Sequence, residues 1–208
     1  MKKHSNGWDV VKHRDLIRVL VRHDLFSSAV SAHPAVPNGM DPPRHTAYRR
    51  IIDHYFEPTC IGEFEATCRE LAGSRWDGLR RGESLEIMEA FARPYALDTQ
   101  CAFVGWPEST REPLARWLVA NQQATREQNR ERLDELAAEF QNLVEEQLEN
   151  RRELGLQGSD VTTRLMKETL SGRPLTGDEI TSILRNWTVG ELATIASAVG
   201  ILAEFLAR

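Results

Sequence analysis

The sequence predicts a mainly α-helical protein with at most one or two short strands. Apolar residues recur at intervals of three and four along most of the chain, which is the period of an amphipathic helix. Proline and glycine, the usual breakers of regular structure, gather between these stretches, at 34–43, 105–113, 155–158 and 172–177. A length of 208 residues suits one large domain, so we expect residues 1–208 to form a single unit.

The composition excludes several classes of protein. Hydrophobic residues make up 41% and charged residues 27%, an ordinary globular balance that excludes a disordered chain. The net charge of -5 argues against nucleic-acid binding, which usually needs a basic surplus. Three cysteines without a CxxC pair suit a reducing compartment. The start lacks a secretory signal, and no window approaches eighteen apolar residues, so we expect a cytoplasmic protein with no membrane contact.

Each element of the first half follows from local spacing. Residues 8–11 are short and β-like, and Leu16, Val19 and Leu20 lie on one face of a helix at 15–21. A loop is expected at 27–40. The pattern predicts further helices from Pro43 to about residue 55, at 64–71 and at 85–91. Proline suits the first turn of a helix because its missing N–H has no partner there.

The second half is more regular. Helices are predicted at 108–124, 127–154 and around 161–166, and the second of these is the clearest amphipathic element, expected on the surface. Thr176 and Glu179 form a capping box ahead of a helix that runs to Leu206. That helix is apolar on all sides and about 45 Å long, so it should be buried. A domain of this size can hardly surround it, and we therefore expect part of the protein to be missing.

Several motifs occur in an order that is familiar as a whole. The stretch 40–50 reads MDPPRHTAYRR and is followed by Phe56 and Pro58, while PLTGDEI precedes the long apolar helix. Between them come FARP at 91–94 and VGWP at 104–107, and FSS stands upstream at 26–28. This order resembles the cytochrome P450 family, the haem-thiolate monooxygenases, from their B helix to their I helix. The resemblance extends from about Trp8 to Arg208 and implies a partial cytochrome P450 fold.

The resemblance implies haem as the cofactor and assigns two residues to it. His45 and Arg49 are four apart and share a helix face, and both can donate hydrogen bonds to an anion. In the family, the matching residues bind the haem propionates. Without the resemblance, both would be interpreted as surface cations. The adjacent Arg50 lies on another face and is expected to be solvated.

The long helix departs from the family pattern of a small residue, glycine, any residue, an acid and threonine. With Gly190 aligned, Leu192 and Ala193 occupy the acid and alcohol positions. Glu191 and Thr194 supply these two groups one place away and are three residues apart, so they are candidates for relaying protons. Alternatively, Glu191 is ion-paired and Thr194 bonds a carbonyl of its own helix. Gly190 suits a close approach to a flat cofactor or to a packed neighbour.

The family's iron ligand is a cysteine in an FxxGxxxCxG loop well after this helix, and no such loop occurs in residues 1–208. Its thiolate favours O–O cleavage. Cys60, Cys68 and Cys101 are not expected to replace it, so no protein ligand to a metal is predicted. The complete enzyme is expected to oxidise a small apolar molecule with electrons from a ferredoxin- or flavodoxin-type donor. The chain alone is expected to be inactive.

Two other classes remain to be weighed. One is an all-helical ligand-binding regulator, or an interaction module without enzymatic activity. The regulator would need DNA-reading helices near the N-terminus. Pro34, Pro37, Pro42 and Pro43 break that helix pair. A histidine-based metal protein is disfavoured because the six histidines are nine to twelve residues apart, which fits no common ligand pattern.

Overall fold

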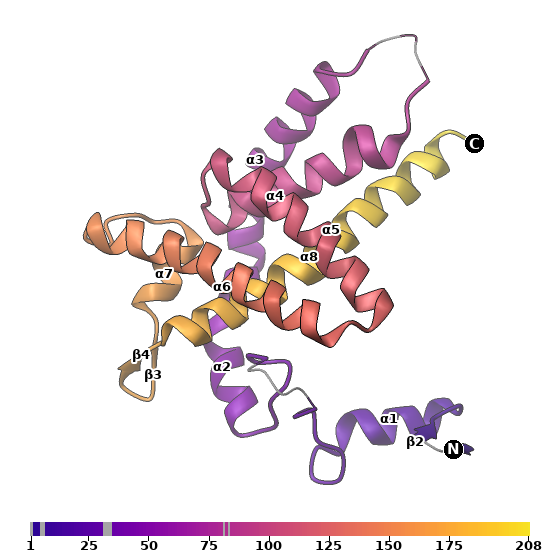
Figure 1. The fold of residues 1–208 in the computed structure, drawn as a ribbon, viewed down its shortest axis with the longest axis vertical. Coiled ribbons are helices and arrows are strands. Elements are labelled where there is room, and N and C mark those ends of the chain that lie inside the picture. The colour runs from indigo at the N-terminus through magenta and orange to yellow at the C-terminus, as the bar shows by residue number, and fades with distance from the viewer. Residues whose placement is uncertain (1, 5–6, 31–34, 81, 83) are drawn as a thin grey trace.

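The computed structural model describes residues 2–4, 7–30, 35–80, 82 and 84–208 (Figure 1). The mainly α prediction is confirmed. The first half contains β1 (Lys2–His4), β2 (Gly7–Asp9), α1 (His13–Val21), α2 (Arg44–Ile52), the 3-10 turn η1 (Asp53–Phe56), α3 (Pro58–Asp77), the π-helical turn η2 (Met88–Ala92) and α4 (Arg93–Val104). The second half contains η3 (Glu108–Thr110), α5 (Arg111–Glu127), α6 (Arg130–Glu153), α7 (Val161–Lys167), β3 (Thr169–Leu170), β4 (Arg173–Pro174) and α8 (Gly177–Leu206).

Strands are few and short. β1 pairs antiparallel with β2, so that Lys3 lies opposite Trp8, and β3 pairs antiparallel with β4. The second hairpin was not expected from the sequence, where this region was interpreted only as a break. Ser171 and Gly172 both have positive φ, 53° and 82°, which is the geometry that closes a two-residue hairpin.

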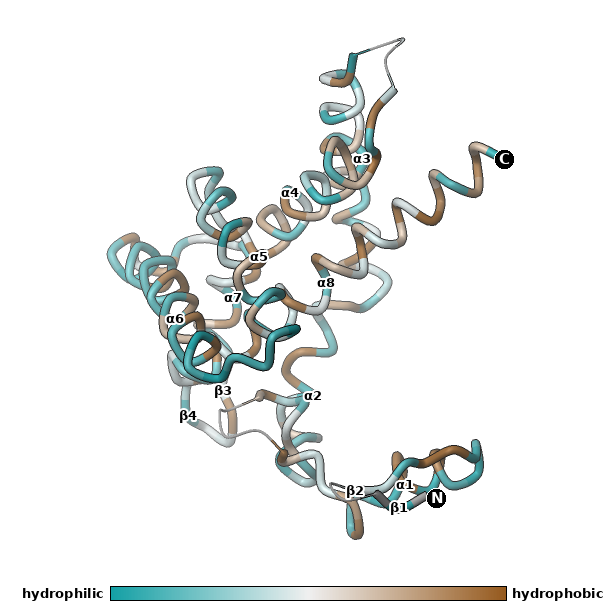
Figure 2. Tube along the Cα trace, turned by 45° about the vertical axis from the view of Figure 1, so that its right-hand side comes forward, coloured by the Kyte–Doolittle hydropathy of each residue, from teal (hydrophilic) through white to brown (hydrophobic). Residues whose placement is uncertain are grey.

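The core forms where α8 crosses α4 and α6. The buried side chains of α8 include Ile183, Leu184, Trp187 and Leu192, and α6 contributes Leu136, Phe140, Val144 and Leu148. Figure 2 shows hydrophilic and hydrophobic stretches alternating along α6. The clearest amphipathic prediction is therefore confirmed, with the helix ends within three residues of the expected ones.

The last turns of α8 differ from the prediction of a helix buried on all sides. Ile201, Leu202 and Phe205 are exposed by 67%, 60% and 73%. Over its most apolar eighteen residues, α8 has a mean hydropathy of 1.6. By length and composition alone it is a weak candidate for a membrane span, a test that core helices of soluble proteins also pass. The expectation that no window qualifies is corrected to this one candidate within the described residues.

Helix α4 was largely missed by the sequence reasoning, which ended a helix at residue 91. Its buried face is polar, with Asp98, Thr99 and Gln100 all buried, so no apolar period marks it. The Asp98 carboxylate lies 2.5 Å from Arg75 on α3 and 3.1 Å from Arg111 on α5. Charge pairing around Asp98 therefore joins α3, α4 and α5.

Gly105 ends α4 in a left-handed conformation with φ of 76°. A Cβ there would lie 2.3 Å from the Cβ of Asp160, the residue that caps α7. The Gly105 carbonyl accepts a hydrogen bond of 2.6 Å from Arg151, which also pairs with Asp160 at 3.0 Å. Glycine is required here by both backbone angle and space.

Candidate functional site

The first part of the candidate site is α2, which carries His45 and Arg49. Its inner face buries Tyr48, Ile51 and Ile52. His45 is half-buried and Arg49 is exposed, with a guanidinium nitrogen 2.5 Å from the Asp53 carboxylate. An exposed ion pair of this kind contributes little, about 0–1 kcal/mol, so Arg49 can exchange Asp53 for another anion. The assignment of both residues to haem propionates stays a prediction.

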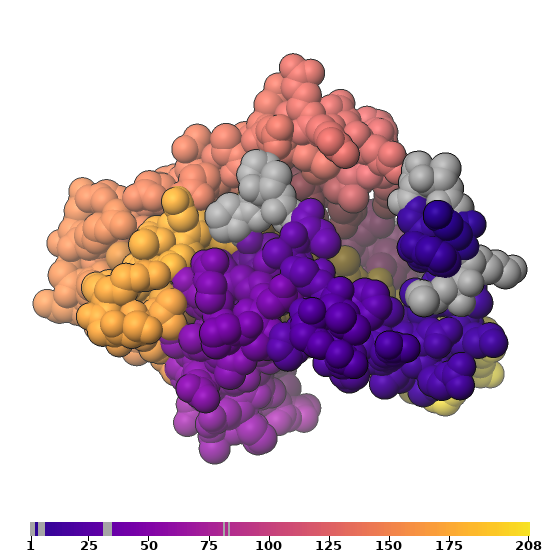
Figure 3. All heavy atoms as spheres, turned by 90° about the horizontal axis from the view of Figure 1, so that it is seen from below, coloured from indigo at the N-terminus to yellow at the C-terminus, as the bar shows by residue number. Residues whose placement is uncertain are grey.

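A partly buried polar contact ties α2 to the start of α8. Glu179 completes the predicted capping box, since its carboxylate accepts from the Thr176 N–H at 2.8 Å and its own N–H donates to the Thr176 hydroxyl at 3.2 Å. The same carboxylate accepts hydrogen bonds from the Tyr48 hydroxyl and, at 2.6 Å, from Arg173. The Arg173 hydrogen bond lowers the pKa of Glu179 to about 2. Seen from below, the purple segment that includes α2 lies beside the orange residues that lead into α8 (Figure 3).

The loop before α2 is also fastened to α8, a contact that the sequence did not reveal. The Val36 N–H donates to the Ser182 hydroxyl at 2.8 Å, and the Asn186 amide donates to the Val36 carbonyl at 2.8 Å. Val36 is 1% exposed. Residues 31–34 of the predicted loop lie outside the described residues. The part at 35–40 is thus held against the same helix that carries Glu191 and Thr194.

The stretch 190–194 of α8 has one open flank. Among the described residues, no heavy atom outside the adjoining helix backbone lies within 4 Å of the position that a Cβ on Gly190 would take. At Gly200, by contrast, a Cβ would lie 2.5 Å from the sulfur of Met88. Of the two uses weighed for glycine in this helix, Gly200 therefore serves a packed neighbour, and Gly190 leaves room for a further group.

Glu191 and Thr194 have different surroundings. The Thr194 hydroxyl bonds the carbonyl oxygens of Gly190 and Glu191, at 2.9 and 3.1 Å, which matches the alternative weighed for this residue. Glu191 is half-buried, and burial raises the pKa of its carboxyl to about 7. Across the described parts of the chain, no hydrogen bond or ion pair is found for that carboxyl. The structure does not join the two side chains, and their role as a relay stays a prediction.

Two of the three cysteines have thiols whose pKa is raised by burial. Cys101 is buried, and burial raises the pKa of its thiol to about 11. Burial also raises the pKa of Cys68. No group of three or more His, Cys, Asp or Glu residues suited to a metal ion occurs among the described residues. His45 and Arg49 on α2 are donors suited to an anion such as a propionate, whereas the thiols of Cys68 and Cys101 lack the lowered pKa of a metal-binding thiolate.

Comparison with known proteins finds curated relatives along most of the chain. No protein-family model matches the chain. A protein of Sinorhizobium fredii named "Probable cytochrome P450 127A1" is 27% identical over 97% of this chain and 49% of its own length. Linalool 8-monooxygenase of Pseudomonas putida is 26% identical over 82% of this chain and 47% of its own. The chain thus spans about half the length of the curated relatives it matches.

Solved structures agree with the sequence matches. A mutant of P450 EryK, in complex with erythromycin B, superposes with a TM-score of 0.71 and 25% identity over 88% of this chain and 49% of its own. An unusual cytochrome P450-like monooxygenase of microbial secondary metabolism reaches a TM-score of 0.79 at 21% identity, over 91% of this chain and 53% of its own. The partial fold predicted from the motifs is confirmed. By sequence and by fold, the chain is related to the cytochrome P450 family and corresponds to about half of a member.

Proposed function

We propose that residues 1–208 are one partial domain of a cytoplasmic haem-thiolate monooxygenase. In this proposal α2 supplies donors for the haem propionates and α8 is the helix on the oxygen side of the haem. The observation that carries the proposal is the relationship to cytochromes P450 over half of their length. The open flank at Gly190 supports it, because a flat cofactor needs a helix surface without a side chain.

The residues of α2 have a binding role in this scheme. His45 and Arg49 each donate to a propionate carboxylate, and Arg49 leaves Asp53 to do so. The contact of Tyr48 with Glu179 fixes α2 relative to the start of α8, so both donors stay at a fixed distance from α8. When bound, haem would supply the iron centre that activates oxygen, and we assign no residue of 1–208 as its thiolate ligand.

The residues of α8 have a proton-handling role. A carboxyl with a pKa of about 7 is suited to give and to take a proton near neutral pH. Glu191 can therefore deliver protons to the open flank of the helix. Thr194 contributes to that relay only after its hydroxyl turns away from the helix carbonyls that it bonds. We propose that the complete enzyme oxidises a small apolar molecule with electrons from a ferredoxin- or flavodoxin-type protein, and that this chain alone is inactive.

The test is a comparison of haem with haem dimethyl ester, which lacks the propionate charges, in a spectroscopic titration of the purified chain. The chain should bind haem more tightly than the ester, and the double variant His45→Gln, Arg49→Gln should lose that preference. Arg50→Gln is the matched control, because this arginine is adjacent and exposed on another face. Equal binding of both compounds by the unaltered chain would refute the propionate assignment.

The same titration tests the missing ligand. After reduction and addition of carbon monoxide, we expect no red-shifted band of the thiolate type. Such a band would mean that Cys60, Cys68 or Cys101 ligates iron, against the raised pKa of the second and third.

The regulator alternative gains nothing from the fold, because α1 ends at Val21 and α2 begins only at Arg44, too far apart for a helix-turn-helix.

A further inference from the structure

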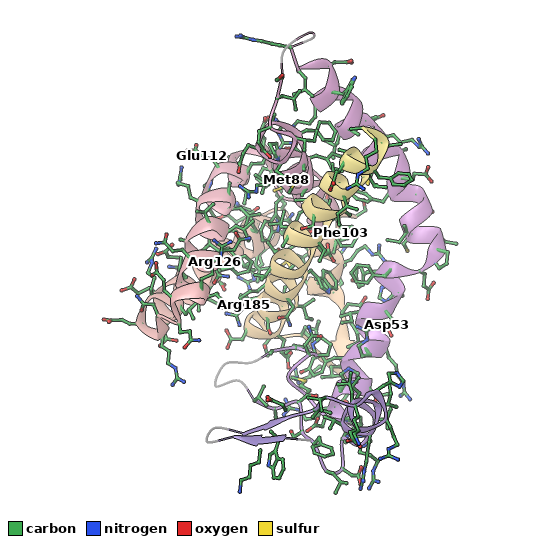
Figure 4. All side chains as sticks on the ribbon, turned by 90° about the vertical axis from the view of Figure 1, so that its right-hand side faces the viewer. Asp53, Met88, Phe103, Glu112, Arg126 and Arg185 are labelled. Atoms are coloured by element: carbon green, nitrogen blue, oxygen red, sulfur yellow. The ribbon has the colours of Figure 1, made fainter. Side chains whose placement is uncertain are left out.

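A cavity of about 670 Å³ lies between α5 and α6. As far as the described residues form its wall, they come from α5, from α6 and from the turn before α5, and none belongs to α2 or α8. Figure 4 shows α5, with Glu112 in its first turn and Arg126 in its last, across α8 from Asp53, the residue that follows α2. The cavity is therefore separate from the residues assigned to haem and to proton transfer.

Part of the cavity wall is apolar and rigid. Pro113, Trp117 and Ala120 follow one another at intervals of four and three on α5, so they share one face, and Leu143 of α6 also lines the cavity. Trp117 is buried, and its indole N–H donates to the Leu136 carbonyl at 2.7 Å, which fixes the orientation of the ring. A fixed aromatic side chain in the wall suits a ligand with a flat ring.

Two buried polar side chains in the same wall have no protein partner. Gln147 of α6 is 4% exposed, and Thr110, which precedes α5, is 5% exposed. Within the described parts of the chain, hydrogen bonds are found for their backbone groups and none for the Gln147 amide or the Thr110 hydroxyl. Neither group is among the side-chain atoms that are sealed from solvent without a partner, so both can be reached through the cavity. Because buried polar groups are normally hydrogen-bonded, these two favour a ligand that bonds to them.

The charges around the cavity do not select an ion. Arg132 and Glu139 both line it and pair with each other at 2.9 Å. Arg116 pairs with Glu112, four residues before it. Among the described lining residues, the remaining charge is that of Glu146, which is exposed and therefore screened by water. Selection in this cavity thus falls to the buried Gln147 amide, which favours a neutral molecule.

We propose that this cavity binds a neutral, flat ring compound that carries a cyclic amide group. The Gln147 side chain has an N–H donor and a carbonyl acceptor side by side, and a cyclic amide presents the matching acceptor and donor, so the two form a pair of hydrogen bonds. The Thr110 hydroxyl can donate to the second lone pair of the ligand carbonyl, and the ring covers Trp117. A carboxylate only accepts and an ammonium only donates, so either would leave half of the Gln147 amide unpaired. This inference goes beyond the proposed function and does not depend on it.

Calorimetric titration of the full chain with 2-quinolone and with N-methyl-2-quinolone tests the site without haem. The probes share a flat ring and a carbonyl, and only 2-quinolone has the amide N–H. It should bind roughly tenfold more tightly, because the methylated probe leaves the Gln147 carbonyl unpaired. Gln147→Met keeps the length of the side chain without its hydrogen bonds and should remove the difference. Gln141→Met is the matched control, because Gln141 lies on the same helix and contacts Asp178 at 3.4 Å, outside the cavity.

Two further measurements test the cavity and the unpaired amide. Ala120→Leu fills the cavity from α5 and should weaken both probes alike, with helix content unchanged by circular dichroism. Gln147→Met should not lower the Tm of the chain without ligand, because the amide that it removes has no protein partner. A lowered Tm, no binding of 2-quinolone to the unaltered chain, or a preference for 2-quinolone that survives Gln147→Met would overturn the proposal. Haem does not enter these measurements, so failure here leaves the proposed function untouched.

Discussion

Gly190 gives the sharpest test of the open flank on α8, because one substitution should act in opposite directions on stability and on haem binding. The residue lies inside a helix, and nothing within 4 Å would meet an added methyl group. Alanine is better than glycine in a helix interior by about 1 kcal/mol. Gly190→Ala should therefore raise the free energy of unfolding by about 1 kcal/mol. With a urea slope of about 2 kcal/mol/M, the midpoint should rise by about 0.5 M.

The same methyl group should hinder a flat cofactor. If haem lies against this flank, Gly190→Ala should weaken haem binding by at least tenfold in the titration described above, as an added methyl in a close contact typically does. Gly73, which lies on α3 and is likewise open within 4 Å, is the matched control. Gly73→Ala should give the same gain in stability with no change in haem binding. If both variants are more stable and both bind haem normally, haem does not approach Gly190. If Gly190→Ala is less stable than the parent, the flank is not open.

Three further substitutions test the surrounding structure. Gly105→Ala should destabilise the chain by about 3 kcal/mol or more in urea unfolding, because of the left-handed φ and the 2.3 Å contact. The control is Gly155→Ala, which has a φ of 67° but open space and should cost only about 1 kcal/mol. Equal costs for the two variants would contradict the steric clash at Gly105. Asp98→Asn leaves two arginines without their shared carboxylate and should cost about 2–3 kcal/mol, lowering Tm by roughly 5–10 °C; an unchanged Tm would show that the network is not stabilising. Burial raises the pKa of Glu191 from 4.5 to about 7, so the carboxylate destabilises the fold progressively as pH rises from about 4.5 to 7. Glu191→Gln should thus leave stability unchanged at pH 4 and raise it by about 3 kcal/mol at pH 8, and a gain of equal size at both pH values would contradict this origin.

Local signals explain which elements the sequence could predict. The capping box of Thr176 and Glu179 lies within four residues, and the apolar period of α6 repeats every turn, so both can be recognised without knowledge of the fold. Helix α4 has no such signal, because its inward residues include Asp98, whose partners come from two other helices. The Val36 contact with Ser182 joins residues 146 apart, and no local pattern encodes it.

The residues of the candidate site also differ in how far local sequence signals could predict them. His45 and Arg49 are predicted to bind propionates because a family motif surrounds them, and the structure adds that Arg49 is held by a weak, exchangeable pair. For Glu191 and Thr194 the spacing left two interpretations open, and the structure gives the two side chains different surroundings. The threonine hydroxyl is taken up by its own helix, whereas the carboxyl is half-buried with a pKa of about 7. An unpaired buried carboxyl costs stability, and such a cost is typical of functional sites. The proton-handling role therefore rests more firmly on Glu191 than on its neighbour, and removing the Thr194 hydroxyl should matter less than neutralising Glu191.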